Sequence, residues 1–198
     1  MSDASTGLVD DLADASNILV MEDGDASVHE RVHETLLSDL HDEAADVFVA
    51  TFSQPGPWLD AWADHISIET AHLGLVHLTE GDTREGYRNG AYVRGVHPGD
   101  LTGLGMAVSD FFDGVSSRSS PTAVCFDSLS ELTAYNDVRK LFRFLRVVTQ
   151  QINRAEAVGH FHLNPVAHDS QSLARLRPPF DVEVECSEAS GVSVSRTH

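Results

Sequence analysis

The end of one predicted strand carries residue types that serve phosphate chemistry in other proteins. Residues 122–126 form an apolar run followed by Asp127 and Ser128, and a carboxylate at such a strand end can hold a magnesium ion. A triphosphate-binding loop also needs a lysine in a glycine-rich turn after the first strand. The one lysine of the chain is Lys140, which lies after this strand, so the sequence excludes a phosphate-binding loop of that kind.

The segment after the first predicted strand is acidic at the position where such a loop would stand. It contains Glu22, Asp23 and Asp25 and no lysine. Proteins hold phosphate with backbone N–H groups, a helix N-terminus and a cation acting together. Three carboxylates reverse the sign of that charge, so we expect this segment to repel a triphosphate, and we predict no cofactor. Asp127 then has two open roles: it caps the following helix or hydrogen-bonds the loop, or it keeps a metal or nucleotide contact.

Histidines raise the question of a metal site, because eleven are present and imidazole is a common zinc ligand. His160 and His162 lie on one face of a predicted strand, and His168 and Asp169 follow after a short loop. No cysteine stands at a zinc-ligand spacing from them. We therefore predict no metal site, and we expect these histidines to hydrogen-bond in the core or to lie at the surface.

A long predicted helix between Asp137 and Glu156 gathers five of the thirteen basic residues, with no acid among them. The five are Arg139, Lys140, Arg143, Arg146 and Arg154. Three of the arginines, at 139, 143 and 146, fall on one helical face, where guanidinium groups can pair with carboxylates. Two interpretations stay open: the five pair with acids of the same chain, or they form a docking face for an acidic protein or a second copy of this chain. Nucleic acid is not expected as a partner, because the formal net charge of −18 opposes it.

The composition is that of an acidic chain with the length of one domain. Its 198 residues include 31 acidic and 13 basic residues, and 41% are hydrophobic. An acidic surplus with almost no lysine resembles the proteins of salt-loving archaea, where molar salt screens charges beyond about 3 Å. The polar, acidic start and the lack of a long apolar run predict a cytoplasmic protein with no membrane contact. Cys125 and Cys186 are predicted to be buried thiols.

Apolar runs and helical periodicities alternate along the chain. Strands are predicted at 17–21, 46–52, 71–78, 92–96, 122–126 and 158–163, and a hairpin at 182–194. Helices are predicted at 28–40, 58–65, 101–115 and 138–152, with a short one around 173–176. This alternation predicts an α/β fold with a mainly parallel sheet, helices on both faces and a C-terminal β-hairpin. Residues 1–15 are expected to form an acidic, flexible N-terminus and 16–198 a single domain.

The order and the amino-acid sequences of these segments resemble the RecA superfamily, and specifically its KaiC-like branch as it occurs in haloarchaea. In that branch the second strand typically ends Val-Thr-Phe-Glu-Glu, whereas this chain reads Val-Ala-Thr-Phe-Ser-Gln at 49–54. Ser53 and Gln54 thus replace the glutamates that help to activate the attacking water. Three later segments, 158–163, 168–176 and 180–184, resemble a haloarchaeal group of shortened KaiC-like proteins of unknown function.

The resemblance implies a three-layer RecA-like fold that lacks the lysine and the glutamates of ATP hydrolysis. Asp127 and Ser128 would be the remnant of its magnesium-binding strand end. We therefore expect no enzyme activity. We predict a pseudo-ATPase domain that regulates or scaffolds other proteins by direct contact in a halophilic archaeon, as a homodimer or beside an active homologue. The alternative is a divergent nucleotide-binding protein or a weak ATPase.

Overall fold

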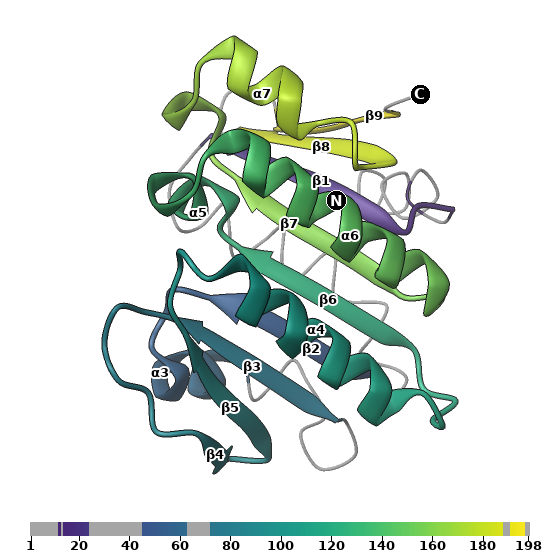
Figure 1. The fold of residues 1–198 in the computed structure, drawn as a ribbon. Coiled ribbons are helices and arrows are strands. Elements are labelled where there is room, and N and C mark those ends of the chain that lie inside the picture. Colours follow the sequence, from purple (N-terminus) through teal and green to yellow (C-terminus); the bar gives the residue numbers. More distant parts are fainter. Residues whose placement is uncertain (1–11, 13, 24–44, 63–71, 188–190, 197–198) are drawn as a thin grey trace.

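The strands form one continuous sheet in a computed structural model that describes residues 12, 14–23, 45–62, 72–187 and 191–196. The strands are β1 (Asn17–Asp23), β2 (Asp46–Thr51), β3 (Leu73–Leu78), β4 (Gly86–Arg88), β5 (Ala91–Val96), β6 (Thr122–Asp127), β7 (Val158–Leu163), β8 (Val182–Ser187) and β9 (Gly191–Arg196). Their order in the sheet is β4-β5-β3-β2-β6-β7-β1-β8-β9 (Figure 1). The inner strands pair in parallel, whereas β4 and β9 run antiparallel to β5 and β8.

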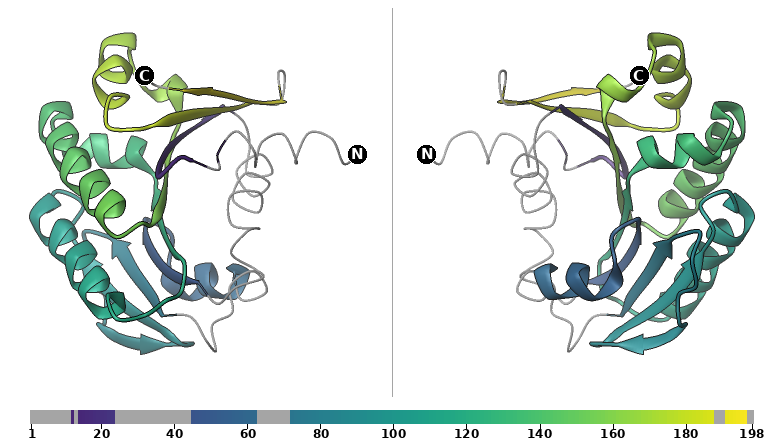
Figure 2. Two further views of the ribbon diagram at one scale, coloured as in Figure 1. Left: turned by 90° about the vertical axis from the view of Figure 1, so that its right-hand side faces the viewer. Right: turned by 90° about the vertical axis from the view of Figure 1, so that its left-hand side faces the viewer.

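Helices lie on both faces of this sheet. They are α3 (Pro55–Trp62), α4 (Leu101–Val115), α5 (Leu129–Tyr135), α6 (Val138–Arg154) and α7 (Ser170–Leu176), with a 3-10 turn at Pro165–Ala167. The two long helices α4 and α6 cover one face together with α5 and α7, and α3 lies on the other face (Figure 2). The predicted three-layer α/β fold with a mainly parallel sheet and a C-terminal hairpin is therefore confirmed.

The larger core lies between the sheet and the layer of α4 and α6. Phe126 on β6 and Phe161 on β7 stack there with ring centroids 5.0 Å apart, and Leu145 of α6 is fully buried in the same cluster. Alternate residues of the strands face the opposite side, where Leu59 of α3 packs in a second cluster with residues of β2, β3 and β5. Since both faces are covered by apolar packing, the inner strands read as nearly continuous apolar runs.

Most of the predicted elements are found within one to three residues of their expected bounds. The helix expected at 58–65 begins earlier, at Pro55, because proline has no N–H to lose and is well suited to the first turn. Two short elements, β4 and α5, were not predicted. The helix expected at 28–40 lies outside the described residues. None of the helices in the described segments combines the length and the apolar character that crossing a membrane requires.

Candidate functional site

The carboxyl ends of the parallel strands bring to one edge of the sheet the acidic residues that the sequence analysis found in place of a phosphate site. Thr51 at the end of β2 is paired in register with Asp127 at the end of β6. Strand β7 separates β6 from β1, which ends in Glu22 and Asp23. Ligands of open α/β sheets bind at this edge. The structure thus places Glu22, Asp23 and Asp127 where the sequence predicted, and Asp25 lies outside the described residues.

The electrostatic character of this edge is acidic. Desolvation, followed by the nearby Asp127 carboxylate, raises the pKa of Glu131 above its ordinary value. The pKa of the Cys125 thiol is raised well above its ordinary range by burial and then by the Asp127 and Glu22 carboxylates. A triphosphate would need a lysine at this edge. The one lysine of the chain, Lys140, lies instead on the exposed side of α6 in the helix layer. The edge is therefore better suited to a cation than to a phosphate group.

The N-cap of α5 is Ser128 and not Asp127, for which capping the helix was one of the expected roles. Ser128 adopts the extended backbone of an N-cap, and its hydroxyl accepts a hydrogen bond from the Glu131 backbone N–H at 3.4 Å. The backbone carbonyl of Asp127 accepts one from the Phe52 N–H at 3.3 Å, which links the ends of β6 and β2. Asp127 and Ser128 thus make structural contacts, which start α5 and join the ends of two strands.

Ser53 and Gln54, which the resemblance to KaiC-like proteins sets at the position of two glutamates, lie between β2 and α3. Ser53 and Gln54 are both exposed, just before α3 begins at Pro55. The Ser53 N–H donates to the Thr51 hydroxyl at 3.1 Å, and the Gln54 carbonyl accepts from the Trp58 N–H at 3.1 Å. Neither a serine hydroxyl nor a carboxamide titrates near pH 7, so these two side chains differ from carboxylates in offering no ready proton acceptor.

The predicted docking residues do lie together on the exposed side of α6. We call the side chains of Arg139, Lys140, Arg143, Arg146 and Arg154 the basic face; all five are exposed. None of them forms an ion pair with an acid in the segments that the structure describes. Val147 lies among them and is 55% exposed. Pairing within the chain therefore finds no support among the described residues.

The histidines are grouped differently from the sequence prediction. His168 lies within 2.9 Å of the Ser130 hydroxyl through Nε2, and Asp169 caps α7 by accepting from the Ser172 N–H at 2.8 Å. Both are separate from His160 and His162, whose rings contact each other edge to face with centroids 5.1 Å apart. The residue that joins these two is Cys125, which the sequence analysis missed because only strand register brings β6 beside β7.

A cavity of about 320 Å³ lies away from the carboxyl edge, between α4 and the strands β3 and β5. Phe111 and Asp110 of α4 line it together with Tyr92 and Arg94 of β5 and Tyr87 of β4. Arg94 forms an ion pair with Asp110 at 3.0 Å across it. The cavity contains none of the residues singled out at the sequence level.

Three solved structures with a similar fold come from two species. The chain matches PH0250 from Pyrococcus horikoshii OT3 with a TM-score of 0.60 and 11% identity, covering 98% of this chain and 92% of that one. It matches the uncharacterized protein PH0321 from the same species, solved in complex with an unknown peptide, with a TM-score of 0.56 and 15% identity, over 90% and 81% of the two chains. The flagellar accessory protein FlaH from Methanocaldococcus jannaschii gives 0.55 and 13%, over 90% and 75%. These similarities confirm that the fold is RecA-like.

Sequence comparison gives a family and no activity. No curated protein matches the chain. A model of a family of unknown function, DUF7504, matches residues 15–186, which include every described strand of the sheet except β9 and Ser187, the last residue of β8. The chain belongs to DUF7504, a family of unknown function.

Proposed function

We propose that this chain is a non-catalytic RecA-like domain that binds an acidic protein surface through the basic face of α6. The observation that carries the proposal is that five basic side chains stand exposed on one helix of a chain with a net charge of −18, without an ion pair among the described residues. From Arg139 to Arg154 they extend over about 22 Å of helix. That length suits the contact between two protein surfaces.

The placement of these charges argues against a role in stabilising the helix itself. Cations are favourable near a helix C-terminus and unfavourable near its N-terminus, by about 0.3–1 kcal/mol each. Arg139 and Lys140 stand in the first turn of α6, where no acid is present inside the helix and Asp137 serves as the N-cap. Two of the five positive charges therefore lie at the helix end where positive charge is unfavourable, which favours a role for them in contacts outside the helix.

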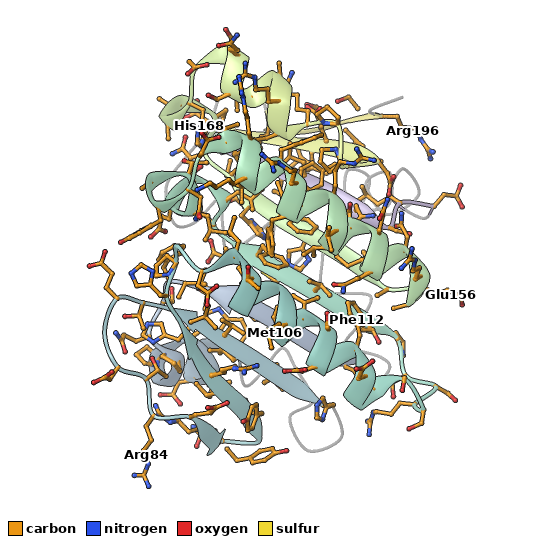
Figure 3. The ribbon with its side chains drawn as sticks, viewed as in Figure 1. Arg84, Met106, Phe112, Glu156, His168 and Arg196 are labelled. Carbon is orange, nitrogen blue, oxygen red and sulfur yellow. The ribbon has the colours of Figure 1, made fainter. Side chains whose placement is uncertain are left out.

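Exposed apolar groups accompany the basic face. Val147 lies within it, and Met106 on the neighbouring helix α4 is 56% exposed on the same side of the molecule (Figure 3). Interfaces combine such apolar contacts with charged pairs at their rim. The similar fold of PH0321 was solved with an unknown peptide, so a domain of this architecture can hold a polypeptide.

The triple variant R139S/R143S/R146S tests the docking role. We expect its association, with itself or with an acidic partner captured quantitatively from a high-salt lysate, to weaken at least about tenfold, or 1.4 kcal/mol. Its melting temperature should stay near that of the original protein, because the three side chains are exposed. Light scattering, quantified capture and thermal melting are the measurements.

A control with the same change of charge is R84S/R175S/R196S, since these three arginines are exposed and lie outside α6. Arg84 and Arg196 lie at opposite ends of the sheet (Figure 3). The control should associate normally. Equal loss in both triples would point to net charge alone, and a lower melting temperature of the first triple with unchanged association would point to ion pairs within the chain.

The alternative function is nucleotide binding by unconventional contacts, which the retained Asp127 and Ser128 would favour. Titrating ATP and magnesium in multimolar KCl, while following thermal stability, distinguishes nucleotide binding from the proposed docking function. A ligand at 100 times its dissociation constant stabilises the folded state by about 2.7 kcal/mol. We expect no shift at millimolar ATP, because Glu22 and Asp23 stand where a triphosphate needs a cation. A clear shift would favour the alternative.

A further inference from the structure

Three potential metal ligands meet in the interior, on the face of the sheet opposite α6. Cys125 lies on β6, and His160 and His162 lie on β7, with Cys125 and His160 paired in register. The neighbouring residues Val124, Phe126 and Phe161 point into the core under α6. Since side chains alternate along a strand, the three potential ligands point to the other face. Cys125, His160 and His162 are 3%, 2% and 1% exposed. Two adjacent strands thus deliver one thiol and two imidazoles to one buried point.

The three ligand atoms are close enough to share one ion. The sulfur of Cys125 and one ring nitrogen of each histidine all lie within 4.8 Å of one another. Tetrahedral zinc, with bonds of about 2.3 Å to sulfur and 2.0–2.1 Å to nitrogen, places its ligand atoms roughly 3.3–3.7 Å apart. The ligand atoms would therefore have to approach one another by about 1 Å. Rotation of the side chains about their χ angles gives this movement without a change in the strands.

A carboxylate orients one of the two imidazoles. Nδ1 of His162 lies 2.9 Å from Oε1 of Glu22 at the end of β1. When Nδ1–H donates to this carboxylate, the lone pair of the ring is on Nε2, which is buried from solvent. A carboxylate that holds the second nitrogen of a ligating histidine in this way is the usual outer partner of a zinc site.

We propose that Cys125, His160 and His162 bind one divalent ion of the zinc class, with Glu22 as the residue that positions His162. Thiolate and imidazole donors select zinc over magnesium and calcium, which prefer oxygen ligands. The local charge agrees, because the Glu22 and Asp127 carboxylates lie near the cysteine and attract a dication. The ion would tie β6 and β7 together beneath the acidic edge of the sheet.

A different explanation of the same geometry is a core in which two histidines and a thiol only pack against each other. Cobalt(II) distinguishes the two, because it reports both the geometry and the donor atoms. The probe experiment uses the full chain carrying Cys186→Ser. Cys186 lies on β8, two strands beyond β7 and four residues further along the sheet than His160, which places their Cα atoms roughly 16 Å apart by strand spacing and rise per residue. The chain has two cysteines, so Cys125 is then its single thiol.

We expect the Cys186→Ser protein to bind one cobalt per chain with a thiolate-to-cobalt charge-transfer band and the intense visible bands of tetrahedral coordination. One equivalent of zinc should remove both. Absence of cobalt binding, or binding without the charge-transfer band, would overturn the proposal. This test needs no substitution in the site itself, so it does not depend on whether site variants fold.

Substitutions then assign the ligands. Cys125→Ser and His160→Gln should each retain less than about one tenth of the zinc that the parent keeps after dialysis, while Cys186→Ser retains all of it. Glu22→Gln should keep the charge-transfer band but weaken zinc binding about 10- to 100-fold. Thermal melting of the metal-free variants monitors the fold. If the site variants melt early while the parent protein itself retains no zinc, the cluster is structural packing only and the proposal fails.

Discussion

At the scale of single residues, one buried carboxylate holds the connection between α4 and β6 to the start of β2. Asp46 is fully buried, and both of its carboxylate oxygens accept from Arg118 Nε, at 2.9 and 2.8 Å. Asp46 also accepts from the His72 backbone N–H at 2.9 Å. A buried carboxylate is tolerated only when it is paired and hydrogen-bonded in this manner. Arg118 therefore contributes to the fold although it lies near the surface.

Replacing Arg118 with serine should lower the free energy of unfolding by about 3 kcal/mol, because it leaves the Asp46 carboxylate buried without its cation. Denaturant unfolding in concentrated KCl measures this, and Arg196→Ser is the control. Arg196 is exposed on the edge strand β9, so its loss should change stability by less than about 0.5 kcal/mol. Equal effects of the two substitutions would show that the Asp46 pair contributes nothing specific.

At the scale of elements, α6 has two faces with different roles. Leu141, Leu145, Val148 and Ile152 are all fully buried against the sheet and the neighbouring helices. The opposite side carries the basic face with Val147 among its charges. The buried apolar residues hold the helix on the sheet, so the basic face is not needed for the packing of α6.

Two truncations on α6 should separate these roles. Leu145→Ala should destabilise the domain by about 2–5 kcal/mol, because it opens a cavity in a closed core. Val147→Ala should change stability by less than about 0.5 kcal/mol and should weaken association through the basic face. Melting and light scattering on both variants check the prediction. A strongly destabilised Val147→Ala, or one with normal association, would contradict the assignment of the two faces.

The same scale shows what the sequence could predict. The periodic apolar positions of α4 and α6 predict both helices, because fifteen and seventeen residues repeat the pattern several times. Strand β4 has three residues, and α5 has seven with only Leu129 and Leu132 buried, so neither carries a readable period. Cys125 and His160 are 35 positions apart in the sequence, and they lie side by side only because of the register of β6 and β7. Such pairing is a property of the assembled sheet.

At the scale of the whole molecule, the charge of −18 is spread over the chain while the basic residues are concentrated. Among the described residues, arginines at 94, 118 and 177 form ion pairs with acids. Most of the acidic groups in the described segments therefore depend on water and salt rather than on a cationic partner in those segments. Self-repulsion of this size destabilises a compact state unless it is screened.

Lowering the salt concentration should consequently destabilise the protein. Between molar salt and about 0.1 M the screening length grows from about 3 to about 10 Å, so carboxylates that did not interact begin to repel. We expect the melting temperature to fall steadily over this range, equally in KCl and NaCl. A mildly acidic buffer at low salt should restore part of the loss by protonating carboxylates. A melting temperature that is independent of salt would rule out a halophilic surface.

The position of β1 has a consequence for how the chain is made. Its two hydrogen-bonded neighbours, β7 and β8, are encoded more than 130 residues later, and Asp181 just before β8 binds the backbone N–H groups of Ser16 and Asn17. During translation the ribosome releases β1 long before either neighbour exists. Strand β1 must therefore wait with both edges open until β7 and β8 have been made, so closure of the sheet around it is a late event in folding during synthesis.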